Sequence, residues 1–165
     1  IEAGEISINL KEYDVGQQIF ETLLSFEKRI DEGKINIEGF EDMGYVPIKA
    51  DMDLLQQVLY NLIDNAIKFS HPNSVIYIRS HVRYGKVFIS VKDTGVGIPK
   101  ESINKIWNRF YKQDISRGKD KKGTGLGLAI VKDIIQAHGE TIDVVSTQDV
   151  GTEFIFTLPK PSQTT

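Results

Sequence analysis

Two asparagines and a lysine lie on one predicted helix at a spacing that suits a metal ion and phosphate. Asn61, Asn65 and Lys68 stand at i, i+4 and i+7, so they share one helical face. Asparagine is a mediocre helix former, because its side chain competes for backbone hydrogen bonds. An amide oxygen is a neutral ligand suited to Mg²⁺, and lysine suits phosphate oxygens. A solvated polar face would have the same pattern, so this motif alone leaves both interpretations open.

A second motif places a carboxylate before a glycine turn. Asp93 ends a predicted strand, and Gly95 and Gly97 follow it in the sequence Asp-Thr-Gly-Val-Gly-Ile-Pro. The glycines allow the backbone to approach a ligand closely, and the carboxylate can accept a hydrogen bond from an exocyclic amine. An aspartic protease also uses Asp-Thr-Gly, but it needs a second such motif and none is visible here. A plain turn after a strand is the simpler alternative.

A glycine-rich run, Gly-Thr-Gly-Leu-Gly-Leu, extends from Gly123 to Leu128 and precedes a predicted helix. Backbone N–H groups at a helix N-terminus, together with the helix dipole, favour phosphate. The run is not a dinucleotide-binding fingerprint, because no strand precedes it and the spacing differs. It is not a P-loop, because no Gly-Lys-Ser/Thr occurs. Another kind of phosphate site remains as the functional interpretation.

An aromatic and basic segment, Ile106 to Lys112, lies before this run and leads into the basic stretch 112–122. The simpler interpretation is a helix whose aromatic residues, Trp107 above all, pack into the core. The functional interpretation is the base of a lid, with Arg109 or Lys112 placed to meet phosphate. By default the charges of residues 112–122 form a solvated surface, but a basic loop ahead of the glycine run favours screening of a polyphosphate.

The elements that must position these residues alternate between helical and strand periodicity. Helices are predicted from Asp14 to about Gly33, from Asp51 to Phe69, over Lys100–Phe110 and from Leu126 to His138. Extended segments are predicted at 5–10, 34–40, 45–50, 75–83, 86–93, 141–146 and 153–158. Hairpins late in the chain indicate a mixed, mostly antiparallel sheet. We therefore expect an α/β (α+β) two-layer sandwich with helices on one face of the sheet and a flexible lid.

Composition excludes several classes of protein. The chain has no cysteine, which excludes disulfides and thiolate chemistry, and its three histidines are scattered. The formal net charge of −3 argues against non-specific nucleic-acid binding. No apolar run approaches the ~20 residues of a membrane span. The start at Ile1 indicates a fragment of a longer protein.

In this order, Asn-x₃-Asn, Asp-x-Gly-x-Gly, Phe-Tyr and Gly-x-Gly-x-Gly resemble the conserved boxes of sensor histidine kinases. These kinases belong to the ATP-binding superfamily shared with DNA gyrase B, the Hsp90 chaperones and the MutL repair proteins (the GHKL superfamily, with the Bergerat fold). The resemblance implies ATP and Mg²⁺ as cofactors. It also implies domain limits: the end of a dimerisation helix with linker and first strand at 1–12, the catalytic domain at 13–159, and a tail at 160–165.

The resemblance implies roles for the motif residues. Asn65 would hold Mg²⁺, Asn61 would lie by the triphosphate, and Lys68 would meet the phosphates. Asp93 would read the adenine amino group. The catalytic residues would be Asn61, Lys68 and Lys112, with Lys112 at the base of the lid where relatives often have arginine. The other expected nucleotide contacts are Gly95, Gly97, Ile98, Phe110, Tyr111, Gly123, Thr124, Gly125, Leu126, Gly127, Leu128 and Thr152.

Position 61 favours a kinase over an ATPase. ATPases of this superfamily resemble one another in a glutamate at this position, which acts as general base for water. Asn61 is an amide and cannot take up a proton at neutral pH. Glu140 departs from the family pattern, because a second glycine usually follows His138-Gly139. His71, His81 and His138 lie in loop, strand and helix-end contexts, so the phospho-accepting histidine is expected outside this chain.

The expected partners are the missing dimerisation domain, which carries the acceptor histidine, and a response regulator, with neither nucleic acid nor direct membrane contact. By analogy, the chain would be a cytoplasmic part of a bacterial inner-membrane sensor protein. Three alternatives stay open: a regulatory nucleotide-binding module, an anti-sigma-type serine kinase, and an ATPase of the gyrase or chaperone type.

Overall fold

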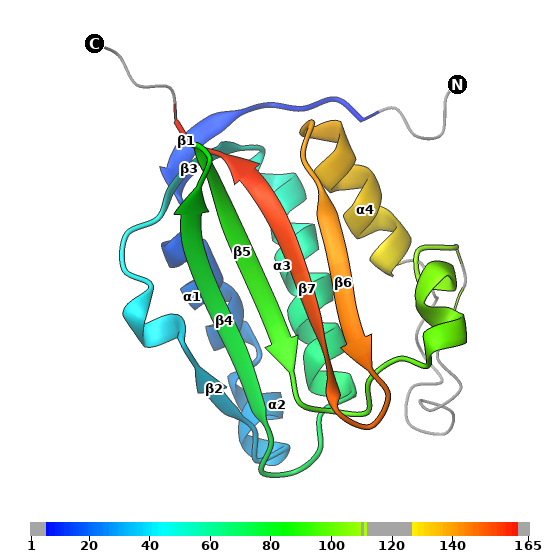
Figure 1. Cartoon of the computed structure of the whole chain (residues 1–165). Helices are drawn as coiled ribbons and strands as arrows, with labels where there is room; N and C mark the ends of the chain where they lie inside the picture. Colours follow the sequence, from blue (N-terminus) through cyan, green and yellow to red (C-terminus); the bar gives the residue numbers. More distant parts are fainter. Residues whose placement is uncertain (1–5, 110, 112–126, 162–165) are drawn as a thin grey trace.

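The computed structural model describes residues 6–109, 111 and 127–161, and its centre is a five-stranded sheet in the order β2-β4-β5-β7-β6. Figure 1 shows this sheet in front of the helices, so the helices cover one of its faces. Only β2 and β4 are parallel, and every other neighbouring pair is antiparallel. A second, two-stranded sheet joins β1 to β3. The strands are β1 Lys11–Asp14, β2 Asn36–Glu38, β3 Pro47–Ala50, β4 Val75–Arg83, β5 Lys86–Asp93, β6 Ile142–Thr147 and β7 Gly151–Pro159. The predicted two-layer sandwich is confirmed.

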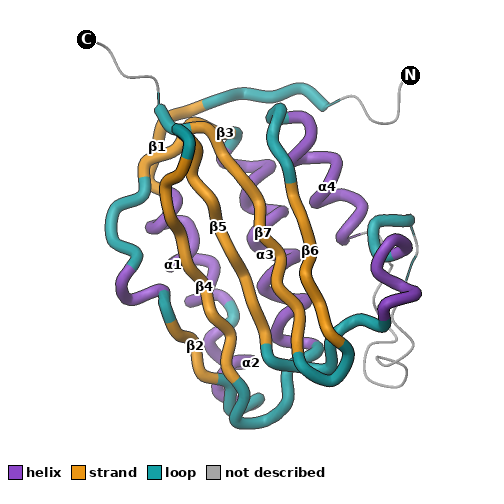
Figure 2. The backbone as a smooth tube through the Cα atoms, in the orientation of Figure 1, coloured by secondary structure: helices purple, strands orange, loops and turns teal. Residues whose placement is uncertain are grey.

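Helices α1, α2 and α3 lie behind the sheet, with α3 near its middle, and α4 lies beside the edge strand β6 in this view (Figure 2). The helical elements are α1 Val15–Ser25, α2 Glu27–Glu32, η1 Phe40–Asp42, α3 Met52–Lys68, η2 Lys100–Lys105 and α4 Gly127–Ala137, where η marks a 3₁₀ helix. The hydrophobic core fills the space between the two layers. It combines the inner side chains of β4, β5 and β7, such as Ile78, Ile89 and Phe156, with the apolar stripe of α3. Burial of that stripe fixes which face of α3 stays available for a ligand.

Helix α3 is capped by Asp51, the residue at which the predicted helix began, and Asp51 also connects distant parts of the chain. Asp51 caps α3 by accepting a hydrogen bond from Leu54 N–H (3.0 Å), and it accepts another from Asn9 N–H (2.9 Å). Its own N–H donates to Nε2 of His138 at the end of α4 (3.0 Å), while Nδ1 of His138 lies 2.8 Å from the carbonyl oxygen of Ile134. Burial alone would raise the pKa of Asp51, but the backbone N–H donors outweigh it and lower that pKa. His138 is therefore structural, as the sequence indicated.

Three predicted elements differ in extent from the structure. The strand expected at 5–10 forms instead at Lys11–Asp14, because that segment pairs with β3. The helix expected from Asp14 to Gly33 is interrupted at Phe26, whose ring is buried against Tyr60 of α3. Just before the break, Ser25 Oγ donates to the carbonyl oxygen of Thr22 (2.6 Å), a side-chain bond of the kind that weakens helices. The third difference is the helix expected over Lys100–Phe110, which is only the short 3₁₀ turn η2.

Glu140, the departure from the family pattern, lies in a buried polar cluster. Its carboxylate accepts hydrogen bonds from Lys86 Nζ at 2.8 and 2.9 Å and from Thr157 Oγ1 at 2.7 Å. These contacts join the α4–β6 turn to β5 and β7. The position therefore carries a structural side chain in this protein. Among the residues that the structure describes, no helix is long and apolar enough to cross a bilayer.

Candidate functional site

The C-terminal half of α3 presents the three predicted polar residues. Asn61, Asn65 and Lys68 are each partly exposed on this buried helix. Lys68 forms an ion pair with Asp64 one turn earlier (Nζ to Oδ2, 3.2 Å), and Asp64 also pairs with Arg29 of α2. Without a ligand, the Lys68 ammonium group is therefore paired with the Asp64 carboxylate. A bound phosphate would compete with Asp64 for this ammonium group.

The start of α4 lies directly against Asn61. A Cβ atom added to Gly127 would lie 3.3 Å from Oδ1 of Asn61, so the absence of a side chain at Gly127 leaves the amide uncovered. Gly127 is the third glycine of the glycine-rich run, and Leu128 follows it as a half-buried residue packed on the core. The fold thus brings the end of the glycine-rich run close to Asn61 on α3.

Asp93 is a buried carboxylate at the end of β5. It is 4% exposed, and Oδ1 accepts a hydrogen bond from Gly95 N–H (2.9 Å). Burial raises the pKa of Asp93 to about 6, although backbone hydrogen bonds from Gly95 and Thr152 and the nearby His71 act in the opposite direction. A carboxylate has lone pairs left after two such bonds. Asp93 can therefore accept a further hydrogen bond from a ligand amine in a site that largely excludes water.

The turn after Asp93 packs so closely that only glycine fits at two positions. A Cβ atom on Gly95 would overlap the carbonyl oxygen of Phe69, the last residue of α3's capping turn, and that oxygen also accepts from Val96 N–H (3.1 Å). Gly97 has φ +70°, and a Cβ atom there would overlap the carbonyl oxygen of Thr147 at the end of β6. The turn thereby joins the C-terminal end of α3 to the β6–β7 turn.

Replacing Gly97 with alanine should lower the free energy of unfolding by about 2 kcal/mol or more, because the change adds a clash to an unfavourable positive φ. Gly85→Ala is the matched control, since Gly85 also has positive φ (+74°) but nothing would lie within 4 Å of its Cβ. Denaturant unfolding of both variants measures the difference. Equal losses in the two variants would show that the close approach at Gly97 is unimportant.

Ser146 on β6 bonds to predicted site residues, although the motifs did not include it. Its Oγ accepts a hydrogen bond from Ile98 N–H (2.8 Å), donates to the carbonyl oxygen of Gly151 (2.9 Å) and lies 2.9 Å from Oγ1 of Thr152. Thr152 in turn lies opposite Asp93 in the β5–β7 register. Ser146 thus connects predicted site residues on two strands. Its place opposite Thr152 in the β6–β7 hairpin was the only signal for it in the sequence.

The segment after η2 is only partly described. Trp107 packs edge-on against Phe154 of the core with ring centroids 5.8 Å apart, which confirms the simpler interpretation of this residue. Arg109 pairs with Asp133 of α4 at 3.4 Å. Tyr111 is half-buried, and its N–H donates to the carbonyl oxygen of Asn108 (3.2 Å). The remaining expected contacts, Phe110, Lys112, Gly123, Thr124, Gly125 and Leu126, lie outside the described residues.

The donor set on α3 fits a magnesium ion that takes most of its ligands from phosphate and water. Mg²⁺ is usually held by one or two protein oxygens together with substrate phosphates, rather than by an all-protein cage. Asn61 and Asn65 offer such neutral oxygens. No group of three or more His, Cys, Asp or Glu residues that could hold a metal occurs within residues 6–109, 111 and 127–161. The amide oxygens of Asn61 and Asn65 would therefore suit a metal ion that also binds phosphate.

Comparison with known proteins identifies a family that this chain resembles. Residues 50–162 match the family described as histidine kinase-, DNA gyrase B- and HSP90-like ATPases. The sensor protein SrrB of Staphylococcus aureus is 48% identical over 111 residues, which are 67% of this chain and 19% of SrrB. The chain thus spans about a fifth of the curated relatives that it matches.

Solved structures of histidine kinases share the fold. The catalytic domain of ThkA has a TM-score of 0.78 at 35% identity, covering 92% of this chain and 98% of that domain. ThkA in complex with the response regulator TrrA gives a TM-score of 0.75 at 32% identity, covering 93% of this chain and 42% of ThkA. Full-length ShkA in complex with AMPPNP gives 0.79 at 29% identity, covering 93% of this chain and 32% of ShkA.

Proposed function

The chain belongs to the histidine kinase-, DNA gyrase B- and HSP90-like ATPase family, and we propose that it binds ATP with Mg²⁺ and transfers the γ-phosphoryl group to a histidine on a separate domain. It is an ATP-binding catalytic domain of the sensor histidine kinase type. The observation that carries the proposal is the meeting of α3, the Asp93 turn and the start of α4 around one site.

The adenine end of the proposed site is formed by Asp93 and the turn that follows it. The Asp93 carboxylate accepts a hydrogen bond from the adenine amino group, which only a ligand with an exocyclic amine can donate at this point. Gly95, Gly97 and Ile98 form the adjacent wall, and their position is supported by the bonds of the turn to Phe69 and Ser146. Thr152 completes this end, since its backbone also bonds the Asp93 carboxylate. Guanine carries a carbonyl oxygen where adenine has its amine, so the site favours ATP over GTP.

The phosphate end of the proposed site is the polar face of α3. Asn65 holds Mg²⁺ through its amide oxygen, Asn61 lies by the triphosphate, and Lys68 leaves Asp64 to meet the phosphates. When bound, Mg²⁺ neutralises charge on the phosphate oxygens. The expected lid residues Phe110, Tyr111, Lys112 and Gly123 to Leu128 belong to the same proposal. The close approach of Gly127 to Asn61 supports it at the end of that run.

Asn61 favours transfer over hydrolysis. An ATPase needs a group that removes a proton from water, and an amide has no such basicity at neutral pH. Phosphoryl transfer depends mainly on positioning and charge neutralisation, which this set of residues can provide. The nucleophile must therefore bring its own basicity, as a histidine imidazole does. The ATPase alternative is disfavoured for this reason.

The partners proposed for this chain follow from its relatives. ThkA was solved in complex with a response regulator, and the chain spans only a fifth of SrrB, a sensor protein. We infer a longer parent that supplies the dimerisation domain with the acceptor histidine, and a response regulator that receives the phosphoryl group. The parent is proposed to be a membrane sensor with this domain in the cytoplasm.

Calorimetric titration with a non-hydrolysable ATP analogue tests the proposed ligand. We expect binding that strengthens when Mg²⁺ is added. Binding of the corresponding GTP analogue should be at least about tenfold weaker, because leaving the Asp93 acceptor without a donor costs more than about 1.4 kcal/mol of binding free energy. Equal affinity for both nucleotides would remove Asp93 from the proposed adenine contact.

The raised pKa of Asp93 predicts that nucleotide affinity depends on pH. The ionised carboxylate is a much stronger acceptor for the amine than the neutral carboxyl group. The ionised form becomes the minority below the pKa of about 6. Affinity should be level above pH 7 and fall by up to about tenfold for each pH unit below 6. Titrations from pH 5 to 8 on the protein and on Asp93→Asn measure this, because the phosphates of the nucleotide titrate identically for both. Parallel pH profiles would exclude Asp93 as the titrating group.

A further inference from the structure

Helix α1 carries two apolar stripes, although a surface helix normally needs one. Val15, Ile19 and Thr22 are buried and face the core. Phe20, Leu23 and Leu24 form a second ridge at i, i+3 and i+4. Phe20 is 42% exposed and Leu24 is 50% exposed. Leu23 packs partly against the core, whereas Phe20 and Leu24 keep much of their apolar surface exposed.

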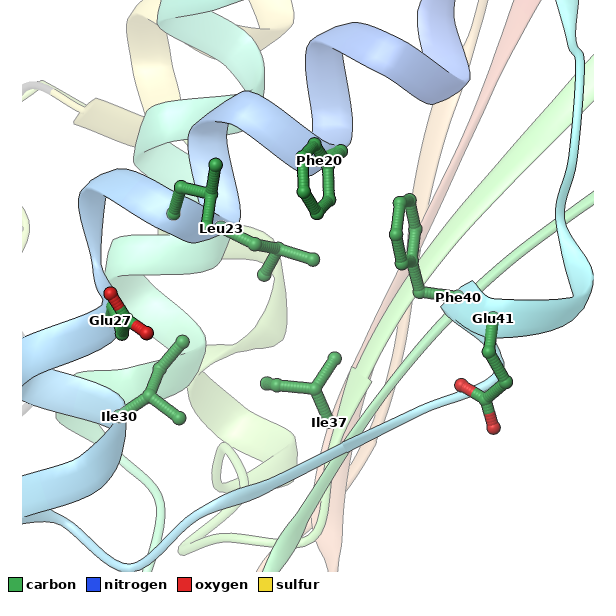
Figure 3. A pocket seen from close by; sticks show the side chains of 8 residues that line it. Phe20, Leu23, Glu27, Ile30, Ile37, Phe40 and Glu41 are labelled. Carbon is green, nitrogen blue, oxygen red and sulfur yellow. The ribbon is translucent and has the colours of Figure 1, made fainter.

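The second ridge forms one wall of an apolar groove of about 230 Å³ (Figure 3). The opposite wall comes from Ile37 of β2 and Phe40 of η1, and Ile30 of α2 lies at one end. The rings of Phe20 and Phe40 are parallel across it, with centroids 6.0 Å apart and an interplanar angle of 9°. The groove is therefore formed by four consecutive elements, α1, α2, β2 and η1.

The charged residues that line the groove are both glutamates. Glu27 lies on the helical wall and Glu41 lies on the wall that η1 forms (Figure 3). The four elements that form the groove carry one exposed base, Lys28, and five other exposed acids: Glu21, Asp31, Glu32, Glu38 and Asp42. Arg29, a nearby cation, is already paired with Asp64. The groove thus combines an apolar floor with negative charge on both sides.

These features select the kind of ligand that fits. A small-molecule site is generally larger, about 300–1,000 Å³, and has polar groups that fix the orientation of its ligand. This groove is smaller, and its lining offers only the two carboxylates at the edge. It matches two or three apolar side chains of another helix, because an i, i+3, i+4 ridge packs against the same kind of ridge on a neighbour.

We propose that this groove, lined by Phe20, Leu24, Ile37 and Phe40 between Glu27 and Glu41, docks an amphipathic helix of a protein partner whose apolar face is flanked by lysine or arginine. The groove lies on the α1, α2 and β2 side of the molecule, whereas α4 and η2 lie at the opposite side (Figure 1). A helix docked there leaves the proposed nucleotide site accessible. The two sites can therefore be occupied together.

Two synthetic helical peptides of about four turns test the proposal. Both carry leucine at i, i+3, i+4 and i+7, one with lysines and the other with glutamates beside the leucines. Fluorescence anisotropy at low salt should give a dissociation constant at least about tenfold lower for the lysine peptide, and added salt should reduce the difference. Leu24→Glu should abolish binding. Glu27→Lys combined with Glu41→Lys should reverse the preference between the peptides.

Val82→Glu is the matched control for Leu24→Glu, because Val82 is also an exposed apolar residue (58%) but lies on β4 away from the groove. It should leave peptide binding unchanged, and all variants should bind the ATP analogue as the unmodified chain does. Equal affinity for the two peptides, or binding that survives Leu24→Glu, would overturn the proposal. Self-association of the chain that Leu24→Glu abolishes would also overturn it, by assigning the ridge to a second copy.

Discussion

Asp93→Asn is expected to weaken binding of the ATP analogue by about 10- to 100-fold, the equivalent of one charge-assisted hydrogen bond. The amide keeps an oxygen that can accept from Gly95 N–H. It also places an NH₂ donor where the carboxylate offered an acceptor. Two donors, the Asn NH₂ and the adenine amine, would then face each other without an acceptor between them. Calorimetry at pH 7.5 measures the loss. Asp143→Asn, at an exposed carboxyl on β6, should have no effect.

Asp93→Asn should not lower the free energy of unfolding at pH 7 relative to the unmodified chain. Burial raises the pKa of Asp93 from 3.8 to about 6, so the folded state favours the neutral form of this group. The stability that comes from this preference is present below pH 3.8 and is lost as the pH rises through about 6. An uncharged amide avoids that loss. Thermal unfolding therefore separates the two causes, because weaker nucleotide binding with a large fall in Tm would indicate misfolding rather than a lost contact.

Asn65→Ala should reduce the rate of phosphoryl transfer by at least about 100-fold, because transition-state charge on the phosphoryl oxygens loses its counter-ion. Binding of the ATP analogue without Mg²⁺ should change little, whereas the strengthening that Mg²⁺ produces should disappear. Titrations with and without Mg²⁺ measure this difference. The partial exposure of Asn65 makes the truncation compatible with folding.

Asn36→Ala is the matched control, since Asn36 is an exposed asparagine on β2, remote from α3 in the sequence and on an edge strand. It should leave both the Mg²⁺ response and transfer intact. If Asn65→Ala kept the full Mg²⁺ response, the metal would have to be held elsewhere, and the polar face of α3 would revert to a solvated surface.

Local periodicity was sufficient to predict the elements that carry the site. The stripe Leu55, Leu59 and Leu62 and the cap Asp51 marked α3, and the turn at Tyr84-Gly85 marked the β4–β5 hairpin, where both residues have positive φ. These signals lie within a few residues of one another, so no tertiary information was needed. The order of the motifs carried the resemblance to the family.

Features that depend on contacts between distant residues could not be predicted. The position of β1 depends on its pairing with β3, and the break at Phe26 depends on packing against Tyr60. The bonds that join Asn9, Asp51 and His138 cross most of the chain. In the sequence, the apolar residues of α1 do not separate into a buried and an exposed set. Only the tertiary structure shows that Phe20 and Leu24 are exposed.

Phosphorylation of a separate acceptor tests the central claim most directly. The chain is incubated with γ-labelled ATP, Mg²⁺ and a histidine kinase dimerisation domain that carries the acceptor histidine. We predict an acid-labile, base-stable label on the dimerisation domain that requires this chain and is lost with Asn65→Ala or when the acceptor histidine is replaced. Steady release of labelled phosphate by the chain alone, with no label on the acceptor, would contradict the account and make the protein an ATPase.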